Sequence, residues 1–288
     1  MKRFSLLIFI SFSLLCACSN QPVKKASGNN SLLWQINGNG IEKPSYLFGT
    51  MHIIPKNDFF LVEGTTEAFD ATDVLVMEID IDIPFKEQLA LASKMIIPNG
   101  KNLSHYMPEE DFTKLKSYLI DSIGVSEKRF NKYIQFKPFF LGGLLIKEYV
   151  GKVKSYEEYF EALRKKSNKQ FMALETLDFQ LSLIDTISIE KQAEGFTQDE
   201  LFSEFDKLLT LYANQDIEGL GKLMSDTEGF EELEYEFIVK RNTLWVEKLD
   251  KLFPTQSMFI AVGAGHLPGE NGVIALLRKI GYSVEPVN

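Results

Sequence analysis

The sequence predicts an α/β fold with a central mixed sheet built from both ends of the chain, and with helical insertions between the strands. Three observations support this prediction. Apolar runs typical of buried strands lie near the N-terminus, near residue 171 and near the C-terminus. Residues 84–167 and 177–250 show mainly helical periodicity. Strand and helix patterns also alternate between residues 46 and 80, which is typical of βαβ units.

The N-terminal strands are predicted to form a hairpin. Residues 32–36 and Tyr46–Phe48 are apolar, and the Asn/Gly-rich residues 37–40 between them favour a turn. Helical spacing follows over residues 59–71, and the run Val74–Asp80 predicts a second core strand. A strand–helix–strand unit therefore opens the predicted sheet.

The middle of the chain is predicted to be helical. Pro108 and Ser126 precede acidic residues in the pattern of helix starts. Residues 136–149 are apolar on most faces, which indicates a buried helix. A strand at Phe171–Glu175 interrupts the helices, and Tyr282–Glu285 closes the chain as a strand.

The candidate site centres on a Gly-x-x-His motif that occurs at both ends of the chain. Gly49–His52 and Gly263–His266 each follow an apolar strand. Side chains just past the carboxyl end of a strand in an open α/β sheet project into a crevice, where such sheets bind ligands. The glycine that opens each motif suits a sharp turn or a close approach of the backbone to a ligand, and Gly265 is a further glycine of the second motif. We therefore expect both histidines to converge on one site.

Two glutamates are candidates for the acidic part of the site. Glu78 lies in the apolar second core strand, and Glu175 ends the strand near residue 171. A carboxylate in such a position must be paired, bound to a metal or placed at the open end of its strand, because burying it alone is too costly. Asp80 lies on the same face as Glu78 by the period of two. An ion pair with a lysine or arginine is the alternative for either glutamate.

These residue types predict a divalent metal site. Neutral imidazole is the commonest metal ligand, and two histidines need one or more carboxylates to complete a site. His52, Glu78 and His266 are the predicted ligands, with coordination positions left open for water. The alternative is that each histidine is a hydrogen-bonded structural residue. His105 lies in a loop ahead of a helix, and we expect it not to be a ligand.

The first residues predict a lipoprotein signal. Lys2 and Arg3 precede an apolar stretch, residues 4–15, that is too short to span a bilayer. Residues 15–18 resemble a bacterial lipobox, in which cleavage leaves Cys18 as the lipid-bearing N-terminus. An ordinary secretory signal is the alternative. Processing at the lipobox would leave no free thiol, which excludes cysteine catalysis and cysteine metal ligands.

This signal divides the chain into three predicted parts. Residues 1–17 form the signal peptide, residues 18–30 a flexible lipidated tether, and residues 31–288 the folded domain. We expect the protein in the bacterial cell envelope, attached to a membrane through the lipid on Cys18. The net charge of −9 argues against nucleic acid as a partner, since a phosphate-backbone binder needs a basic face.

Several short motifs follow one another along the chain. They are Gly49–His52, the strand that ends in Glu78, Leu174–Thr176 with Gln180, Arg241–Asn242, Gly263–His266, and residues 272–277 with 281–284. Together these motifs resemble the TraB/GumN family, whose animal relatives are the Tiki metalloproteases. The resemblance extends from about residue 32 to residue 287, which is nearly all of the predicted mature chain. Two Gly-x-x-His motifs with a glutamate strand after the first make the combination fairly specific.

The resemblance implies an α/β fold with a central sheet, shared distantly with erythromycin-esterase-like and haem-uptake proteins. It also implies a divalent metal, often manganese or cobalt in the Tiki branch, and peptide-bond hydrolysis there. The family's motifs place the metal or catalytic set at His52, Glu78 and His266. They place further candidate catalytic positions at Glu175, Arg241 and Asn242.

We therefore expect a membrane-anchored, metal-dependent hydrolase that acts on a peptide or small molecule, with manganese, cobalt or zinc as its ion. The metal would lower the pKa of a bound water, and a carboxylate free of the metal would move the proton. Arg241 would stabilise an oxyanion or hold a substrate carboxylate, although an arginine in such a charged helical run is more often solvated or ion-paired. Two alternatives stay open. One is a binding module that holds a small peptide or a haem-like ligand through the same histidines, and the other is a structural envelope lipoprotein.

Overall fold

The computed structural model describes residues 21–25, 30–194, 196–226 and 233–287. Cys18, the predicted signal peptide and the first residues of the predicted tether lie outside the described part of the chain. Within the described ranges, no helix is both long and apolar enough to cross a bilayer.

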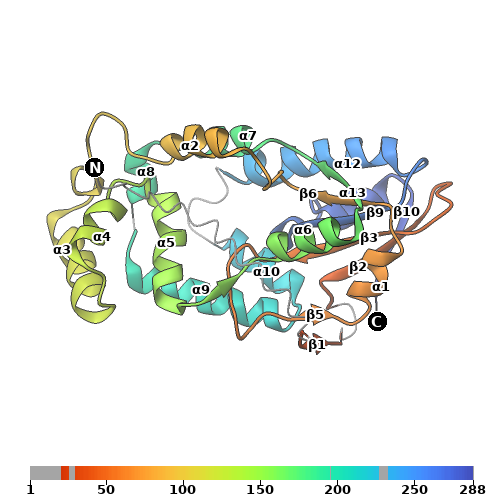
Figure 1. Ribbon diagram of the computed structural model, residues 1–288, viewed down its shortest axis with the longest axis horizontal. Helices are drawn as coiled ribbons and strands as arrows, with labels where there is room; N and C mark the ends of the chain where they lie inside the picture. Colours follow the sequence, from red (N-terminus) through yellow and green to blue (C-terminus); the bar gives the residue numbers. More distant parts are fainter. Residues whose placement is uncertain (1–20, 26–29, 195, 227–232, 288) are drawn as a thin grey trace.

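The largest sheet of the described residues has six strands and lies in the half of the molecule on the right of Figure 1. Its strands are β2 (Leu33–Gly38), β3 (Ser45–Thr50), β6 (Val74–Met77), β8 (Gln170–Ala173), β9 (Met258–Gly263) and β10 (Tyr282–Pro286). They lie in the order β10-β2-β3-β9-β6-β8. Strands β3, β9, β6 and β8 are parallel, and β2 is antiparallel to both of its neighbours. The sheet is therefore mixed and drawn from both ends of the chain, which confirms the predicted fold class.

The four parallel strands end along one edge of the sheet. Thr50, the last residue of β3, pairs with Gly263, the last residue of β9. Met77, the last residue of β6, pairs with Ala261 in β9 and with Ala173 at the end of β8. Residues that follow these strands are consequently delivered to a common crevice.

The apolar content of the strands explains why this sheet is buried. Every residue of β6 and the first five residues of β9 are buried, as expected for parallel strands covered on both faces. An aromatic cluster packs against the sheet. The centroid of the Phe160 ring lies 4.8 Å from that of Phe259 and 5.2 Å from that of Phe48. Such contacts bury a large apolar area and fix the sheet against its helices.

Figure 1 shows helices beside the sheet. They are α1 (Thr65–Asp70), α6 (Tyr156–Ser167), α12 (Lys240–Leu252) and α13 (Val273–Lys279). Three further helices join the sheet to the helical half of the molecule. They are α2 (Phe85–Lys94), α7 (Leu177–Ile184) and α10 (Ile217–Ser225).

The helical half has a hydrophobic core of its own, which includes Leu103, Leu119, Leu141 and Phe202. Its helices are α3 (Glu109–Ser117), α4 (Glu127–Tyr133), α5 (Pro138–Val150), α8 (Ile189–Ala193) and α9 (Gln198–Ala213).

The described chain also contains short helical elements and short strands. The short helical elements are η1 (Leu103–His105), η2 (Tyr118–Ser122), η3 (Tyr235–Val239) and η4 (Ala264–His266). The two-residue strands are β1 (Val23–Lys24), β4 (Ile54–Pro55), β5 (Leu61–Val62) and β7 (Val153–Lys154).

The structure departs from two of the sequence predictions. Residues 59–71 do not form one helix, because β5 occupies part of this segment and Gly64, with a φ of 84°, precedes the helix that starts at Thr65. The predicted tether is not free along its whole length. Its residues Val23–Lys24 pair in parallel with β5, and the Lys24 Nζ donates to the Ala213 carbonyl at 2.9 Å.

Candidate active site

The site lies where the parallel strands leave the buried core. His52 follows β3, Glu78 follows β6 directly, Glu175 follows β8, and His266 ends the turn η4 after β9. The parallel strands are mainly apolar, and charged residues follow where the backbone emerges at the carboxyl edge. Four predicted site residues therefore come from four neighbouring strands.

Gly263 is the point around which three of these side chains meet. A β-carbon built on Gly263 would lie 3.2 Å from Glu78 Oε1, 3.6 Å from His266 Cδ2 and 3.9 Å from His52 Nε2. The Gly263 backbone N–H donates to Glu78 Oε1 at 2.7 Å. The structure thus brings His52, Glu78 and His266 together, and this glycine leaves the space between them open.

Arg241 places a buried cation in the same site. Its Nη2 donates to Glu78 Oε2 at 2.7 Å and to Glu175 Oε1 at 2.5 Å, while Nε also donates to Glu175 at 3.0 Å. Its Nη1 donates to the Phe237 carbonyl and to His266 Nε2, both at 3.1 Å. The five N–H groups of the guanidinium all have partners, and the side chain is only 8% exposed.

This geometry corrects one expectation about Arg241. The arginine is neither solvated nor available to an oxyanion, because its donors are already used within the protein. The helix α12 turns it inward, and the guanidinium lies 4.8 Å from the Trp245 ring centre. The Trp245 indole also donates to Glu175 Oε2 at 3.2 Å. Arg241 therefore serves as an internal counter-ion of two carboxylates.

Asn242 sets the tautomer of His266. The Asn242 amide nitrogen donates to the carbonyls of His266 and Asn271 at 3.2 and 2.8 Å, so its Oδ1 is the acceptor toward His266 Nδ1 at 2.7 Å. Nδ1 therefore carries the proton, and Nε2 presents a lone pair to Arg241. Burial lowers the pKa of His266 to about 3, which keeps this imidazole neutral at pH 7.

His52 is held from the opposite side by Glu157, a residue that the sequence analysis missed. His52 Nδ1 lies 2.9 Å from Glu157 Oε1, and the carboxylate also accepts from Thr50 at 2.7 Å and Ser155 at 2.5 Å. The charge of Glu157 raises the pKa of His52 to about 9. Its other ring nitrogen, Nε2, faces Gly263 on a side chain that is 64% exposed. Glu157 stands in a charged helix start, and nothing in that pattern marks it as a site residue.

Glu78 stays ionised at neutral pH. Burial alone would raise the pKa of Glu78, but the neighbouring His266, His52, Arg241 and the Gly263 N–H together hold it at about 2. Gln180 adds a hydrogen bond to this set, since its Nε2 donates to Glu78 Oε2 at 2.9 Å and to Glu175 Oε1 at 2.8 Å.

Two of the motif glycines, Gly49 and Gly265, pack against other side chains of the protein and do not border the site. A β-carbon on Gly49 would lie 3.1 Å from Leu267 Cδ2, and one on Gly265 would lie 2.5 Å from Met224 Sδ. Both glycines therefore allow elements to pack closely around the site. Of the three, Gly263 is the one that borders the site side chains.

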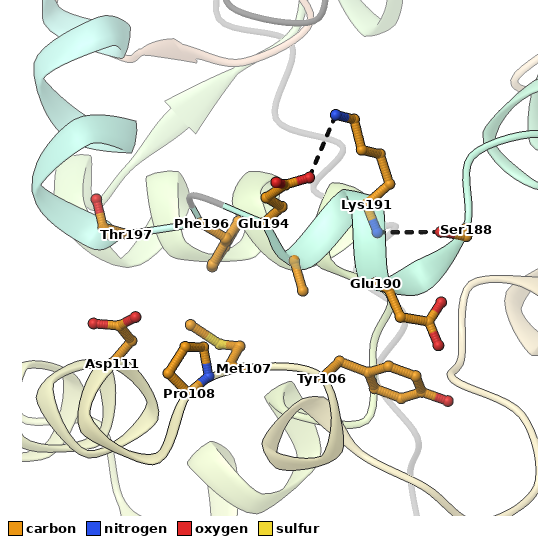
Figure 2. Close-up of a pocket in the computed structure, with 11 residues that line it drawn as sticks. Tyr106, Met107, Pro108, Asp111, Ser188, Glu190, Lys191, Glu194, Phe196 and Thr197 are labelled. Carbon is orange, nitrogen blue, oxygen red and sulfur yellow. Dashed lines mark hydrogen bonds and ion pairs between the residues drawn. The ribbon is translucent and has the colours of Figure 1, made fainter.

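Three other features lie outside the site. Asp80 is exposed and its Oδ1 accepts from the Asp82 N–H at 2.8 Å, so it adds no ligand. His105 ends η1, where its ring bonds to Asn102. A cavity of about 550 Å³ in the helical half is lined by residues such as Tyr106 and Lys191 (Figure 2), and it contains none of the site residues.

Comparison with known proteins identifies the family. Residues 32–286 match the TraB/PrgY/gumN family. The chain belongs to this family. Metalloprotease TIKI1 of Xenopus tropicalis is 24% identical to it, over 91% of this chain and 62% of the relative. Human Metalloprotease TIKI1 is 25% identical, over 93% and 64%. Metalloprotease TIKI2 of Danio rerio is 24% identical, over 89% and 61%.

The TraB/PrgY/gumN match covers the whole sheet, including both Gly-x-x-His motifs. The chain spans about three fifths of the length of these curated relatives. No solved structure gives a significant match. Similarity to the Tiki proteins therefore supports a possible metalloprotease at the level of the family.

The donor atoms of this TraB/PrgY/gumN member do not form the predicted metal centre. In the part of the chain that the structure describes, no group of three or more His, Cys, Asp or Glu side chains is placed to hold a metal ion. The physical reason is Arg241. Its Nη1 donates to the His266 Nε2 lone pair, and its Nη2 donates to Glu78 Oε2, so two of the three predicted ligands already face a cation. The set of His52, Glu78 and His266 consequently does not fit a metal in this arrangement.

Proposed function

We propose that this chain is a membrane-anchored hydrolase that cleaves peptide bonds at the carboxyl edge of the central sheet. The observation that carries the proposal is the His52–Glu157 pair, which opens onto the ionised Glu78. A carboxylate that holds one ring nitrogen of a histidine and leaves the other free is a recurring arrangement of proton-transfer catalysts. The names of the Tiki relatives support peptide as the substrate class.

His52 is the proposed proton donor. Hydrolysis of an amide needs a proton delivered to the leaving nitrogen as the carbon–nitrogen bond breaks. Glu157 holds Nδ1 and raises the pKa of His52 to about 9, so Nε2 carries a proton at neutral pH. Its exposed position gives a substrate access to that nitrogen.

Glu78 is the proposed partner of the attacking water. Its Oε2 is engaged by Arg241 and Gln180, whereas Oε1 accepts from the Gly263 N–H and points toward the space between the histidines. An ionised carboxylate in that position orients a water by accepting a hydrogen bond from it, and it takes up the proton that the water loses as its oxygen bonds to the carbonyl carbon. The negative charge of Glu78 also favours the protonated form of His52.

Metal dependence is a separate part of the proposal and rests on the name of the relatives, with manganese, cobalt or zinc as the candidate ions. We assign no step to a metal, because the donor set does not fit one while Arg241 holds His266. The same contact disfavours the alternative binding module that would hold a haem-like ligand through both histidines.

A peptide library tests the proposed reaction. The purified chain is incubated with the library under chelator, and separately with each of the three ions, and new peptide termini are identified by mass spectrometry. The expected result is cleavage of internal peptide bonds that His52→Ala abolishes. Intact peptides under every condition, with a correctly folded chain, would refute the proposal.

A further inference from the structure

The guanidinium of Arg241 occupies the site as a cation that the protein itself supplies. The guanidinium nitrogens lie 2.7 Å from Glu78 Oε2, 2.5 Å from Glu175 Oε1 and 3.1 Å from His266 Nε2. Two carboxylate oxygens and one imidazole nitrogen are the donor types that first-row divalent metals prefer. Here all three atoms converge on the positive charge of one side chain.

The same guanidinium is fixed in place. Its five N–H groups are all bonded, it lies against the Trp245 ring, and it is buried. Its planar shape matches carboxylates in a way that a flexible ammonium does not, so it is a strong counter-ion for Glu175 and Glu78. A divalent ion on His266 Nε2 would have to displace this hydrogen-bonded cation and then lie beside its charge.

We propose that Arg241 is the resident cation of the site and excludes divalent metal ions from Glu78, Glu175 and His266. Any metal that the wild-type chain binds is therefore held without His266. Removal of the guanidinium converts the three donors into a metal-binding set. This inference is independent of the peptidase proposal, since it concerns the chain in the absence of substrate.

Calorimetric titration with zinc tests the inference. The wild-type chain and His266→Gln should bind zinc with the same affinity and stoichiometry. Arg241→Ala should bind one additional zinc ion at least ten-fold more tightly than the wild type, and the added change His266→Gln should remove that gain. Arg241→Lys keeps the positive charge and should gain nothing, as should Lys240→Ala, whose side chain pairs with Glu236 on the surface.

Two results would overturn the inference. One is tight zinc binding by the wild type that His266→Gln weakens ten-fold or more. The other is a folded Arg241→Ala chain, verified by circular dichroism, that gains no zinc affinity. If Arg241→Ala does not fold, the comparison of wild type with His266→Gln still decides the question. None of these readouts requires catalysis, so loss of the peptidase proposal and loss of this inference are distinguishable.

Discussion

Arg241 illustrates how burial changes the role of a charged side chain. In the sequence it stands next to Lys240 in a run of charged residues, where an exposed position is the usual expectation. In the fold, Lys240 reaches the surface and pairs with Glu236, while Arg241 turns toward the strand ends and pairs with Glu78 and Glu175. Helical periodicity indicates which face of the helix is buried, but it does not indicate which carboxylates contact that face.

Arg241→Ala should destabilise the protein strongly. Loss of the guanidinium leaves Glu78 and Glu175 as buried charges without their counter-ion, and breaking such a pair costs about 3–5 kcal/mol. Lys240→Ala removes an exposed ion pair and should change the free energy of unfolding by less than about 1 kcal/mol. Urea unfolding of both variants measures the difference. Equal, small losses would show that Arg241 is not buried between carboxylates.

Glu157→Gln should lower the pKa of His52. The charge of Glu157 raises this pKa from the ordinary 6.5 to about 9, and a neutral amide removes that attraction. The stabilisation from protonated His52 is fully present below pH 6.5 and is lost as the pH rises through about 9. A proton NMR titration of His52 should therefore give a midpoint well above 7 in the wild type and one closer to 6.5 in the variant. Identical titration midpoints in the wild type and the variant would contradict the ion pair between His52 and Glu157.

At the level of elements, the parallel strands determine most of the site. The convergence of His52, Glu78 and His266 was predictable, because apolar strands followed by Gly-x-x-His or by glutamate deliver their polar residues to one edge of an α/β sheet. Glu157 was not predictable, since it comes from the first turn of α6 and its approach to His52 depends on how that helix packs. The place of Arg241 depends likewise on the packing of α12.

Gly263→Ala should disturb the site at the end of β9. The added β-carbon would lie 3.2 Å from Glu78 Oε1. The carboxylate must therefore shift, which weakens the hydrogen bond that it accepts from the backbone N–H of residue 263. We expect hydrolytic activity to fall at least ten-fold with little loss of thermal stability. Gly143→Ala is the matched control, because its β-carbon would meet Ile53 Cδ1 at an ordinary 3.6 Å. Full activity in Gly263→Ala would place the reaction elsewhere.

The whole molecule combines a predicted sheet with a helical half that the sequence described only in outline. Residues 84–167 are mainly helical as predicted, apart from the two-residue strand β7, but the periodicity did not show that α3, α4 and α5 share a second core with α8 and α9. Such a core depends on contacts between residues far apart in the chain. The predicted tether was also incomplete, because pairing of β1 with β5 depends on a partner strand that looked helical in the sequence.

Membrane attachment is a prediction about the whole protein, and it falls on residues outside the described ranges. Cys18→Ala should move the protein from the membrane fraction to the soluble fraction, because the acyl chains on this cysteine are the proposed anchor. Fractionation followed by mass spectrometry of the N-terminus measures both the location and the lipid. A wild-type chain with an unmodified Cys18 would contradict the lipobox assignment.

The central claim is that peptide hydrolysis depends on the His52–Glu157 pair at the carboxyl edge of the sheet. The most direct measurement is kcat/KM for a cleaved peptide in the wild type, His52→Ala, Glu157→Gln and Lys240→Ala. We predict a loss of at least 100-fold for His52→Ala, at least ten-fold for Glu157→Gln, and wild-type values for Lys240→Ala, since general acid–base catalysis contributes about 10²–10⁴-fold. Retention of full activity by His52→Ala, or equal losses in all three variants, would contradict the account.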